Sequence, residues 1–188
     1  MRPLATVLYE DSMAAGAGGE FPLHDLVLAM VCDQLPDEEL QVWGLRRRIP
    51  CNPRRGINKL INDLAKTDVI ASQGKLCVVV DHDRIARHLG LTPDSNDAGI
   101  IEALRQRSDA PAKLSVFFLR PNMEGLLASI EGCGGLRAPP CKNLNARDIV
   151  LQKVAWNEGP QVRDCVASEQ PGLGDLSKML ADLHRDCA

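Results

Sequence analysis

Two almost entirely apolar runs constrain the fold of this chain more than any other feature. Residues 76–80 read LCVVV and residues 114–119 read LSVFFL. Runs of this length and composition are typical of strands that are buried on both faces of a sheet. A third apolar run at 4–9, LATVLY, is rich in β-branched and aromatic residues and is the expected first strand.

Segments with apolar residues at helical spacing separate these runs. Helices are expected at 22–35, 56–66, 84–90, 97–107, 122–130, 146–156 and 173–186. The stretch LQVWGL at 40–45 is read as a short strand or an irregular piece. Strands that alternate with helices predict an α/β fold, in which a small, mainly parallel sheet is flanked by helices and followed by a helical C-terminal part.

The charge and cysteine content narrow the class of protein. The net charge is −3, so the chain has no overall attraction to nucleic acid, and any polyanion must be bound locally. No signal peptide and no membrane span are expected, because no apolar run approaches roughly 20 residues. The seven cysteines lack the paired spacing of zinc sites, so we expect reduced, buried thiols in a cytoplasmic protein. An irregular metal site using Cys133, Cys141 and the C-terminal HRDC is left open.

Acidic residues follow three of the expected strands. Glu10 follows the first strand, Asp81 and Asp83 follow the central one, and the third leads through Arg120 into a helix that carries Glu124. Parallel strands bring these groups to one edge of the sheet, where oxygen-rich clusters suit Mg²⁺ or Mn²⁺. The alternative is that single acids cap the following helices, as Asp81 or Asp83 would do for the helix at 84–90.

The order of these acids resembles the TOPRIM (topoisomerase–primase) pattern, over roughly residues 4–130. That pattern places an acid after the first strand, Asp-x-Asp after a later one, and then a strand that leads into a Glu-containing helix, here FFLRPNMEGLL. The chain looks most like OLD-type nucleases and small stand-alone TOPRIM-like proteins often encoded beside an ATPase. Ser12 replaces the usual glycine of the first motif, and Asp11 adds a carboxylate. We expect residues 1–132 to form the TOPRIM-like (Rossmann-like) domain, with 133–188 as a helical extension packed on it.

The resemblance implies a nuclease that hydrolyses phosphodiester bonds with a divalent metal ion, in phage defence or repair. Glu10 would be a metal ligand or general base, Asp81 and Asp83 would hold the first ion, and Glu124 a second. The partners implied are DNA or RNA and an ATPase; whether the chain also forms a homo-oligomer is left open. The alternative is a non-catalytic TOPRIM-like subunit of an ATPase complex. A third interpretation is a receiver-like phosphoacceptor. It fits less well, because such a domain needs a well-placed lysine late in the chain, and the positions of Lys142 and Lys153 in the order of elements do not suit that role.

One segment is strongly basic. Residues 46–59, RRRIPCNPRRGINK, contain no acid. Such a segment can bind the phosphate backbone, and the arginines at its centre precede a helix whose N-terminus favours anions. The alternatives are a solvated run of charge or a docking site for an acidic partner. The candidate nucleic-acid contacts are Arg46, Arg47, Arg48, Arg54, Arg55, Lys59 and Arg120.

Overall fold

Four parallel strands form a single sheet at the centre of the chain. The structure is a computed structural model, and it describes residues 3–10, 21–36, 40–54, 56–66, 74–92, 95–134 and 144–187. The strand order is β2-β1-β3-β4, and all neighbouring pairs are parallel. The strands are β1 (Ala5–Tyr9), β2 (Cys51–Pro53), β3 (Lys75–Asp81) and β4 (Leu114–Leu119). The predicted α/β class is confirmed.

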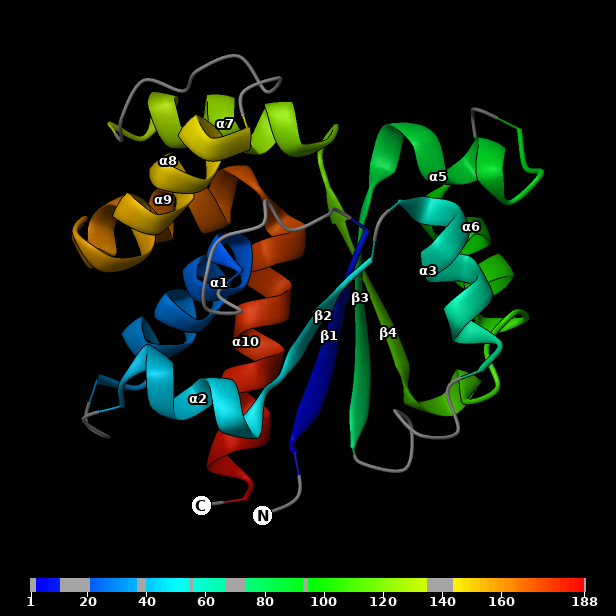
Figure 1. The fold of residues 1–188 in the computed structure, drawn as a ribbon, viewed down its shortest axis with the longest axis horizontal. Helices are drawn as coiled ribbons and strands as arrows, with labels where there is room; N and C mark the ends of the chain where they lie inside the picture. Colours follow the sequence, from blue (N-terminus) through cyan, green and yellow to red (C-terminus); the bar gives the residue numbers. More distant parts are fainter. Residues whose placement is uncertain are drawn as a thin grey trace.

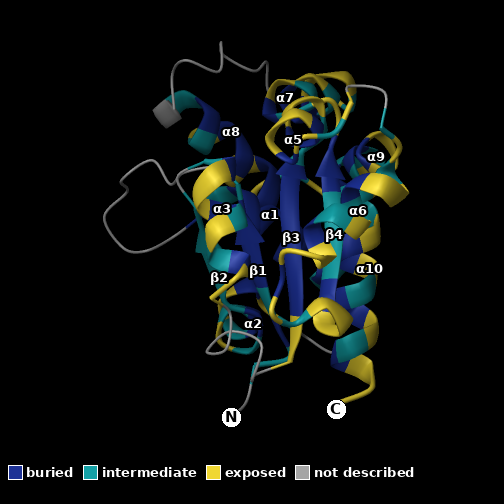
Figure 2. Cartoon of the chain, turned by 90° about the vertical axis from the view of Figure 1, so that its right-hand side faces the viewer, coloured by how far each residue is buried: buried dark blue, intermediate teal, exposed yellow. Residues whose placement is uncertain are grey.

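The central strand β3 is buried on both faces, as its apolar run predicts. It pairs with β1 from Ala5↔Lys75 to Tyr9↔Val79, and on its other edge it pairs with β4. Successive side chains point to opposite faces of a strand. Accordingly, Cys77 and Val79 belong to one hydrophobic cluster, whereas Leu76, Val78 and Val80 belong to the other. The sheet therefore separates two cores, and β3 is dark blue over most of its length in Figure 2.

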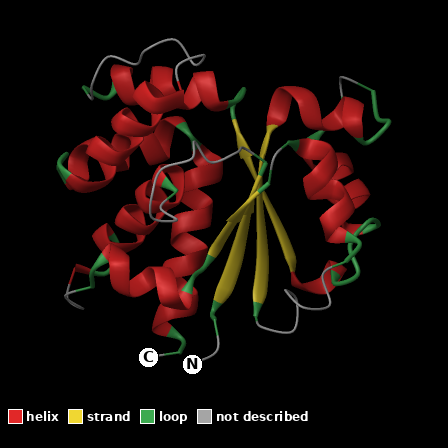
Figure 3. Cartoon of the chain, viewed as in Figure 1, coloured by secondary structure: helices red, strands yellow, loops and turns green. Residues whose placement is uncertain are grey.

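Helices cover both faces of the sheet (Figures 1 and 3). One face packs against α1 (Pro22–Asp33) and the C-terminal helices, which share one hydrophobic cluster. The C-terminal helices are α8 (Leu144–Trp156), α9 (Pro160–Glu169) and α10 (Pro171–Arg185). The other face packs against α3 (Ile57–Leu64), α5 (His82–His88) and α6 (Asp97–Arg105). Two further helices, α2 (Val42–Arg48) and α7 (Met123–Gly132), precede β2 and follow β4.

The last helix lies very close to the edge strand β4. A Cβ atom at Gly172 would lie 2.2 Å from the Phe118 carbonyl oxygen, so only glycine permits this approach of α10. The helices after residue 133 thus belong to the core that covers one face of the sheet. Among the described helices, none combines the length and apolar character that a membrane span requires.

Three elements differ from the sequence prediction. Residues 42–48 form the helix α2, so the prediction of a short strand or irregular piece at 40–45 is wrong. The spacing of Val42, Leu45 and Ile49, which are all buried, is helical and outweighs the β propensity of Val42. The short strand β2 and the helix α9 were not predicted, because β2 is only three residues long and α9 has a mixed surface.

The expectation that the cysteines are reduced is wrong for one pair. Cys133 and Cys165 form a disulfide that links the end of α7 to α9. They are 32 residues apart, and only the packing of the two helices brings them together, so no local spacing could reveal the bond. Cys32, Cys51, Cys77 and Cys187 are free. Cys141 lies outside the described residues, and Cys133 is not available as a thiolate ligand for the irregular metal site.

Candidate functional site

The candidate site lies where β1 and β3 end, at the point where the chain changes direction across the sheet. From β1 the chain runs outward to β2, and then returns past β1 to form β3 and β4. In open parallel sheets, ligands bind at the carboxyl ends of the strands at such a switch point. These ends lie at the top of Figure 1, away from the two chain termini.

Glu10 and Asp81 are brought together at this position. The Glu10 backbone N–H donates to the Val79 carbonyl oxygen over 3.0 Å, which continues the ladder between β1 and β3 by one residue. The Glu10 carboxylate then accepts a hydrogen bond from the Asp81 backbone N–H, with Oε2 and N 2.9 Å apart. Both residues are half-buried. The expectation that the acids after the first and central strands share one edge therefore holds for this pair.

Asp83 lies in the first turn of α5 and is tied to the connection between β4 and α7. Its Oδ2 accepts a hydrogen bond from Asn122 Nδ2 at 2.8 Å, and its backbone N–H donates to the Pro121 carbonyl oxygen at 3.1 Å. Asn122 also caps α7, because its Oδ1 accepts from the Gly125 N–H. Asp83 is exposed, so this network orients the carboxylate without removing it from solvent.

Glu124 lies in the first turn of α7 and is exposed. Within the described chain, its carboxylate has no hydrogen bond or ion pair. The described residues also contain no group of three His, Cys, Asp or Glu side chains placed to hold a metal ion. Asp11 and Ser12, which follow Glu10 directly, lie outside the described residues.

A second group of polar side chains lies beside these acids and was not predicted. Asp97, the first residue of α6, accepts from His82 Nε2 through Oδ1 at 3.1 Å and from Arg120 Nη2 through Oδ2. The residue before it, Asn96, caps α6. The three side chains lie 15 and 23 residues apart, so no local pattern reveals their contact.

The pKa of Asp97 reflects the two donors beside it. Partial burial acts to raise this pKa, but the hydrogen bond and charge of Arg120, followed by those of His82, outweigh burial and hold the pKa below its usual range. Asp97 is therefore ionised in the free protein.

The N-terminal half of the basic segment is engaged in contacts within the protein. Arg46 forms two hydrogen bonds with the buried carboxylate of Asp25, at 2.9 and 2.7 Å, and its guanidinium lies 5.9 Å from the centre of the Trp156 ring. Arg48 Nη1 lies 2.9 Å from Nδ1 of His184, which is buried against α2. Arg47 is exposed.

The other half of the segment lies at the opposite end of β2. Arg54 follows this strand, and its Nε lies 3.3 Å from Asp63 Oδ2, with 15% of the arginine side chain exposed. Lys59 is exposed on α3, and Arg55 lies outside the described residues. Since α2 precedes β2 and Arg54 follows it, the basic run is divided between the two ends of a strand.

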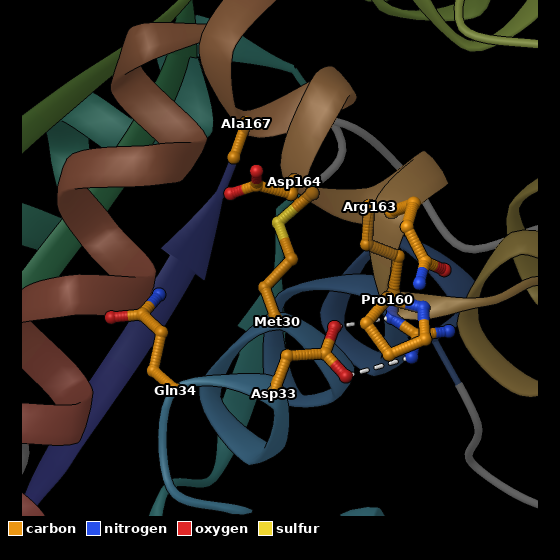
Figure 4. A pocket seen from close by; sticks show the side chains of 8 residues that line it. Met30, Asp33, Gln34, Pro160, Arg163, Asp164 and Ala167 are labelled. Carbon is orange, nitrogen blue, oxygen red and sulfur yellow. Dashed lines mark hydrogen bonds and ion pairs between the residues drawn. The ribbon is translucent and has the colours of Figure 1, made fainter.

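A pocket of about 270 Å³ lies elsewhere, between α1 and α9 (Figure 4). Its wall includes Met30, Asp33 and Arg163. Asp33 accepts from Arg163 at 2.6 and 2.8 Å, and Arg163 also donates to the carbonyl oxygens of Val154 and Glu158. These charges satisfy each other, so we assign the candidate site to the strand ends and not to this pocket.

No family model, curated protein or solved structure matches this chain.

Proposed function

We propose that this chain hydrolyses phosphodiester bonds in nucleic acid with the help of Mg²⁺ or Mn²⁺. The observation that carries the proposal is the contact between Glu10 and Asp81 at the switch point of the sheet, with 2.9 Å between the Glu10 carboxylate and the Asp81 N–H. Acids held at the carboxyl ends of adjacent parallel strands are well placed for a substrate that approaches this edge.

The donors at the site fit a hard divalent cation. Mg²⁺ is commonly bound by one or two carboxylates together with waters and substrate phosphates, so a complete protein cage is not required. Glu10 and Asp81 would supply the first carboxylates, Asp83 would join them, and Glu124 would assist a second ion. A bound ion would polarise the phosphate and lower the pKa of an attacking water.

The residues of the chain itself have separate tasks in this proposal. The Asp81 N–H fixes the orientation of the Glu10 carboxylate, which then serves as ligand or general base. Asn122 holds Asp83 in the same way. Arg120 provides positive charge beside the acids and so reduces their repulsion of a phosphodiester. The side-chain tasks of Glu10, Asn122 and Arg120 can each be removed by a single substitution.

The TOPRIM-like order of the acids supports the same proposal and extends it. By that resemblance the substrate is DNA or RNA, and the chain acts with a partner ATPase in defence or repair. We place the protein in the cytoplasm, which suits its free cysteines Cys32, Cys51 and Cys77. The disulfide Cys133–Cys165 is the contrary feature, since such bonds are rarer in reducing compartments.

The test is cleavage of supercoiled plasmid, single-stranded DNA and RNA, each with Mg²⁺, with Mn²⁺ and with a chelator. We expect Asp81→Ala, Asp83→Ala and Glu10→Gln to lower the cleavage rate by at least about a hundredfold, because each removes a group that orients or activates the reactants. Glu124→Gln should lower it less. Asp109→Asn, an exposed carboxylate near the opposite end of the sheet, is the matched control.

The second candidate is a non-catalytic subunit that uses this edge to bind a partner protein. The division of the basic segment favours it, because Arg46 and Arg54 are already paired with Asp25 and Asp63 and offer little continuous positive surface. The cleavage assay is therefore run with and without the partner ATPase. Cleavage that survives the loss of both Asp81 and Asp83 would exclude hydrolysis at this site.

A further inference from the structure

Two side-chain nitrogen donors at the strand ends share one carboxylate. Arg120 follows β4, His82 begins α5 and Asp97 begins α6, so the three side chains come from three different connections. Each oxygen of Asp97 has its own donor: Oδ1 accepts from His82 Nε2 at 3.1 Å, and Oδ2 accepts from Arg120 Nη2. His82 follows Asp81 directly in the chain, which puts this arrangement beside the proposed metal ligands.

The two donors are held in place independently of Asp97. The Phe118 ring packs edge-on against the His82 ring, with 5.4 Å between the ring centres. The Arg120 guanidinium lies 5.6 Å from the centre of the Phe118 ring. The backbone of Arg120 is clamped by the buried side chain of Gln170, which accepts from its N–H at 2.9 Å and donates to its carbonyl oxygen at 2.8 Å. The donors are thus preorganised for an anion between them.

Asp97, in contrast, is easily displaced. Its side chain is 45% exposed, and capping of α6 depends on Asn96, whose Oδ1 accepts from the Gly99 N–H at 2.9 Å. Exposed ion pairs of this kind are weak, so a ligand that replaces Asp97 would lose roughly fivefold in affinity or less.

We propose that Arg120 and His82 form the seat for a substrate phosphate, and that Asp97 occupies this seat until the phosphate displaces it. A phosphodiester presents two non-bridging oxygens that share one negative charge and match the two donors, and arginine binds phosphate with a planar pair of N–H groups. Asp97 then acts as an internal competitor. The identity of the ligand as nucleic acid rests on the proposed function, whereas the anion seat itself rests only on these contacts.

The experiment measures binding of inorganic phosphate and of a fluorescent oligothymidylate to the full chain in chelator. Asp97→Asn removes the competing charge and should raise both affinities about three- to fivefold. Arg120→Gln removes the main donor and should lower them by about tenfold. Two exposed residues serve as matched controls: Arg105, the last residue of α6, and Asp109, which lies beyond that end; Arg105→Gln and Asp109→Asn should leave both affinities unchanged.

A double variant separates displacement from a general charge effect. If Asp97 acts by occupying the seat, its substitution should give a much smaller gain in the Arg120→Gln background, where only the contact with His82 remains; an undiminished gain there would overturn the proposal. Circular dichroism melting curves check that each variant folds, and Arg120→Met, which also removes the donor but keeps the apolar stem of the side chain, replaces Arg120→Gln if that variant does not fold.

The outcome is distinguishable from that of the proposed function. Metal-dependent cleavage that requires Asp81, together with affinities unchanged in Asp97→Asn and Arg120→Gln, would overturn the seat and leave hydrolysis standing. Phosphate binding that follows the expected pattern in a protein that cleaves nothing would support the seat and count against hydrolysis.

Discussion

Adjacent residues at the end of β1 belong to two very different polar environments. Tyr9 points into the core, where its hydroxyl bonds to His24 Nδ1 at 2.9 Å, and His24 Nε2 lies 2.8 Å from the Ile49 carbonyl oxygen. Asp25, beside His24 on α1, is paired with Arg46. Glu10, one residue further along the strand, belongs instead to the open strand ends with Asp81.

The comparison shows that burial, more than residue type, separates polar groups that support the fold from polar groups that a ligand can reach. In the cluster of buried Tyr9, His24 and Asp25 with half-buried Arg46, the polar groups are satisfied within the protein, so substitutions should cost stability. At the strand ends, Asp83 and Glu124 face solvent, where they have access to an ion or a substrate. Substitutions there should cost activity and little stability.

The largest effect is expected from Asp25→Asn. Asp25 is 1% exposed, and the substitution leaves the largely buried charge of Arg46 without its partner, which should lower the free energy of unfolding by about 3 kcal/mol. Urea denaturation measures this change. The exposed Asp109→Asn should stay within about 0.5 kcal/mol of the unmodified protein, and similar losses in both variants would break the comparison.

Acid should weaken the same buried cluster through His24. Burial, outweighing the hydrogen bond to Ile49, lowers the pKa of His24 to about 4, so its ring is neutral at pH 7; Nε2–H donates to Ile49, and Nδ1 accepts from the Tyr9 hydroxyl. The unfolded chain binds a proton at about pH 6.5, well before the folded protein does. The contribution of neutral His24 to the free energy of unfolding should therefore be fully present above pH 6.5. This contribution should fall by about 3 kcal/mol as the pH drops to about 4.

Urea denaturation between pH 4 and pH 7 isolates this contribution when His24→Gln is compared with the unmodified chain. The variant should be less stable at pH 7 but should lose less stability on acidification, because it lacks the group that titrates. Parallel pH profiles in the two proteins would show that His24 does not drive the loss.

The smallest effect concerns the two cations near the start of α3. Arg54 is already paired with Asp63, whereas Lys59 is exposed. If nucleic acid contacts this end of the sheet, Lys59→Ala should reduce the slope of log affinity against log salt by about 0.9, because one phosphate contact is lost. Arg54→Ala should change it less. Binding titrations at several salt concentrations measure both slopes. A larger change of slope in Arg54→Ala than in Lys59→Ala would show that Arg54, and not Lys59, is the main phosphate contact.

Much of the fold could be predicted from periodicity. The run LCVVV predicts a doubly buried strand because hydrophobic side chains on both faces need cover, and β3 has cores on both sides. The meeting of Glu10 and Asp81 follows from parallel strands, whose carboxyl ends share one edge. These features depend on local pattern and topology alone.

Contacts between distant side chains could not be predicted in this way. The pairing of Asp97 with Arg120 and the hydrogen bond from Asn122 to Asp83 depend on how helices dock on the sheet, and they join residues 23 and 39 apart. The pairing of Arg46 with Asp25 also depends on this docking. Because of it, the basic residues that are continuous in sequence do not form a continuous positive surface. Tertiary packing therefore decides which charges are free to act.

The most direct test of the central claim compares melting curves of the unmodified protein and Asp81→Asn with and without Mn²⁺. Without metal, the variant should be more stable by about 1 kcal/mol, because repulsion among the strand-end carboxylates is relieved. Mn²⁺ should raise the melting temperature of the unmodified protein and have much less effect on the variant, while Asp109→Asn should respond as the unmodified protein does. An equal response to Mn²⁺ in the unmodified protein and Asp81→Asn would contradict a metal-dependent site at the ends of β1 and β3.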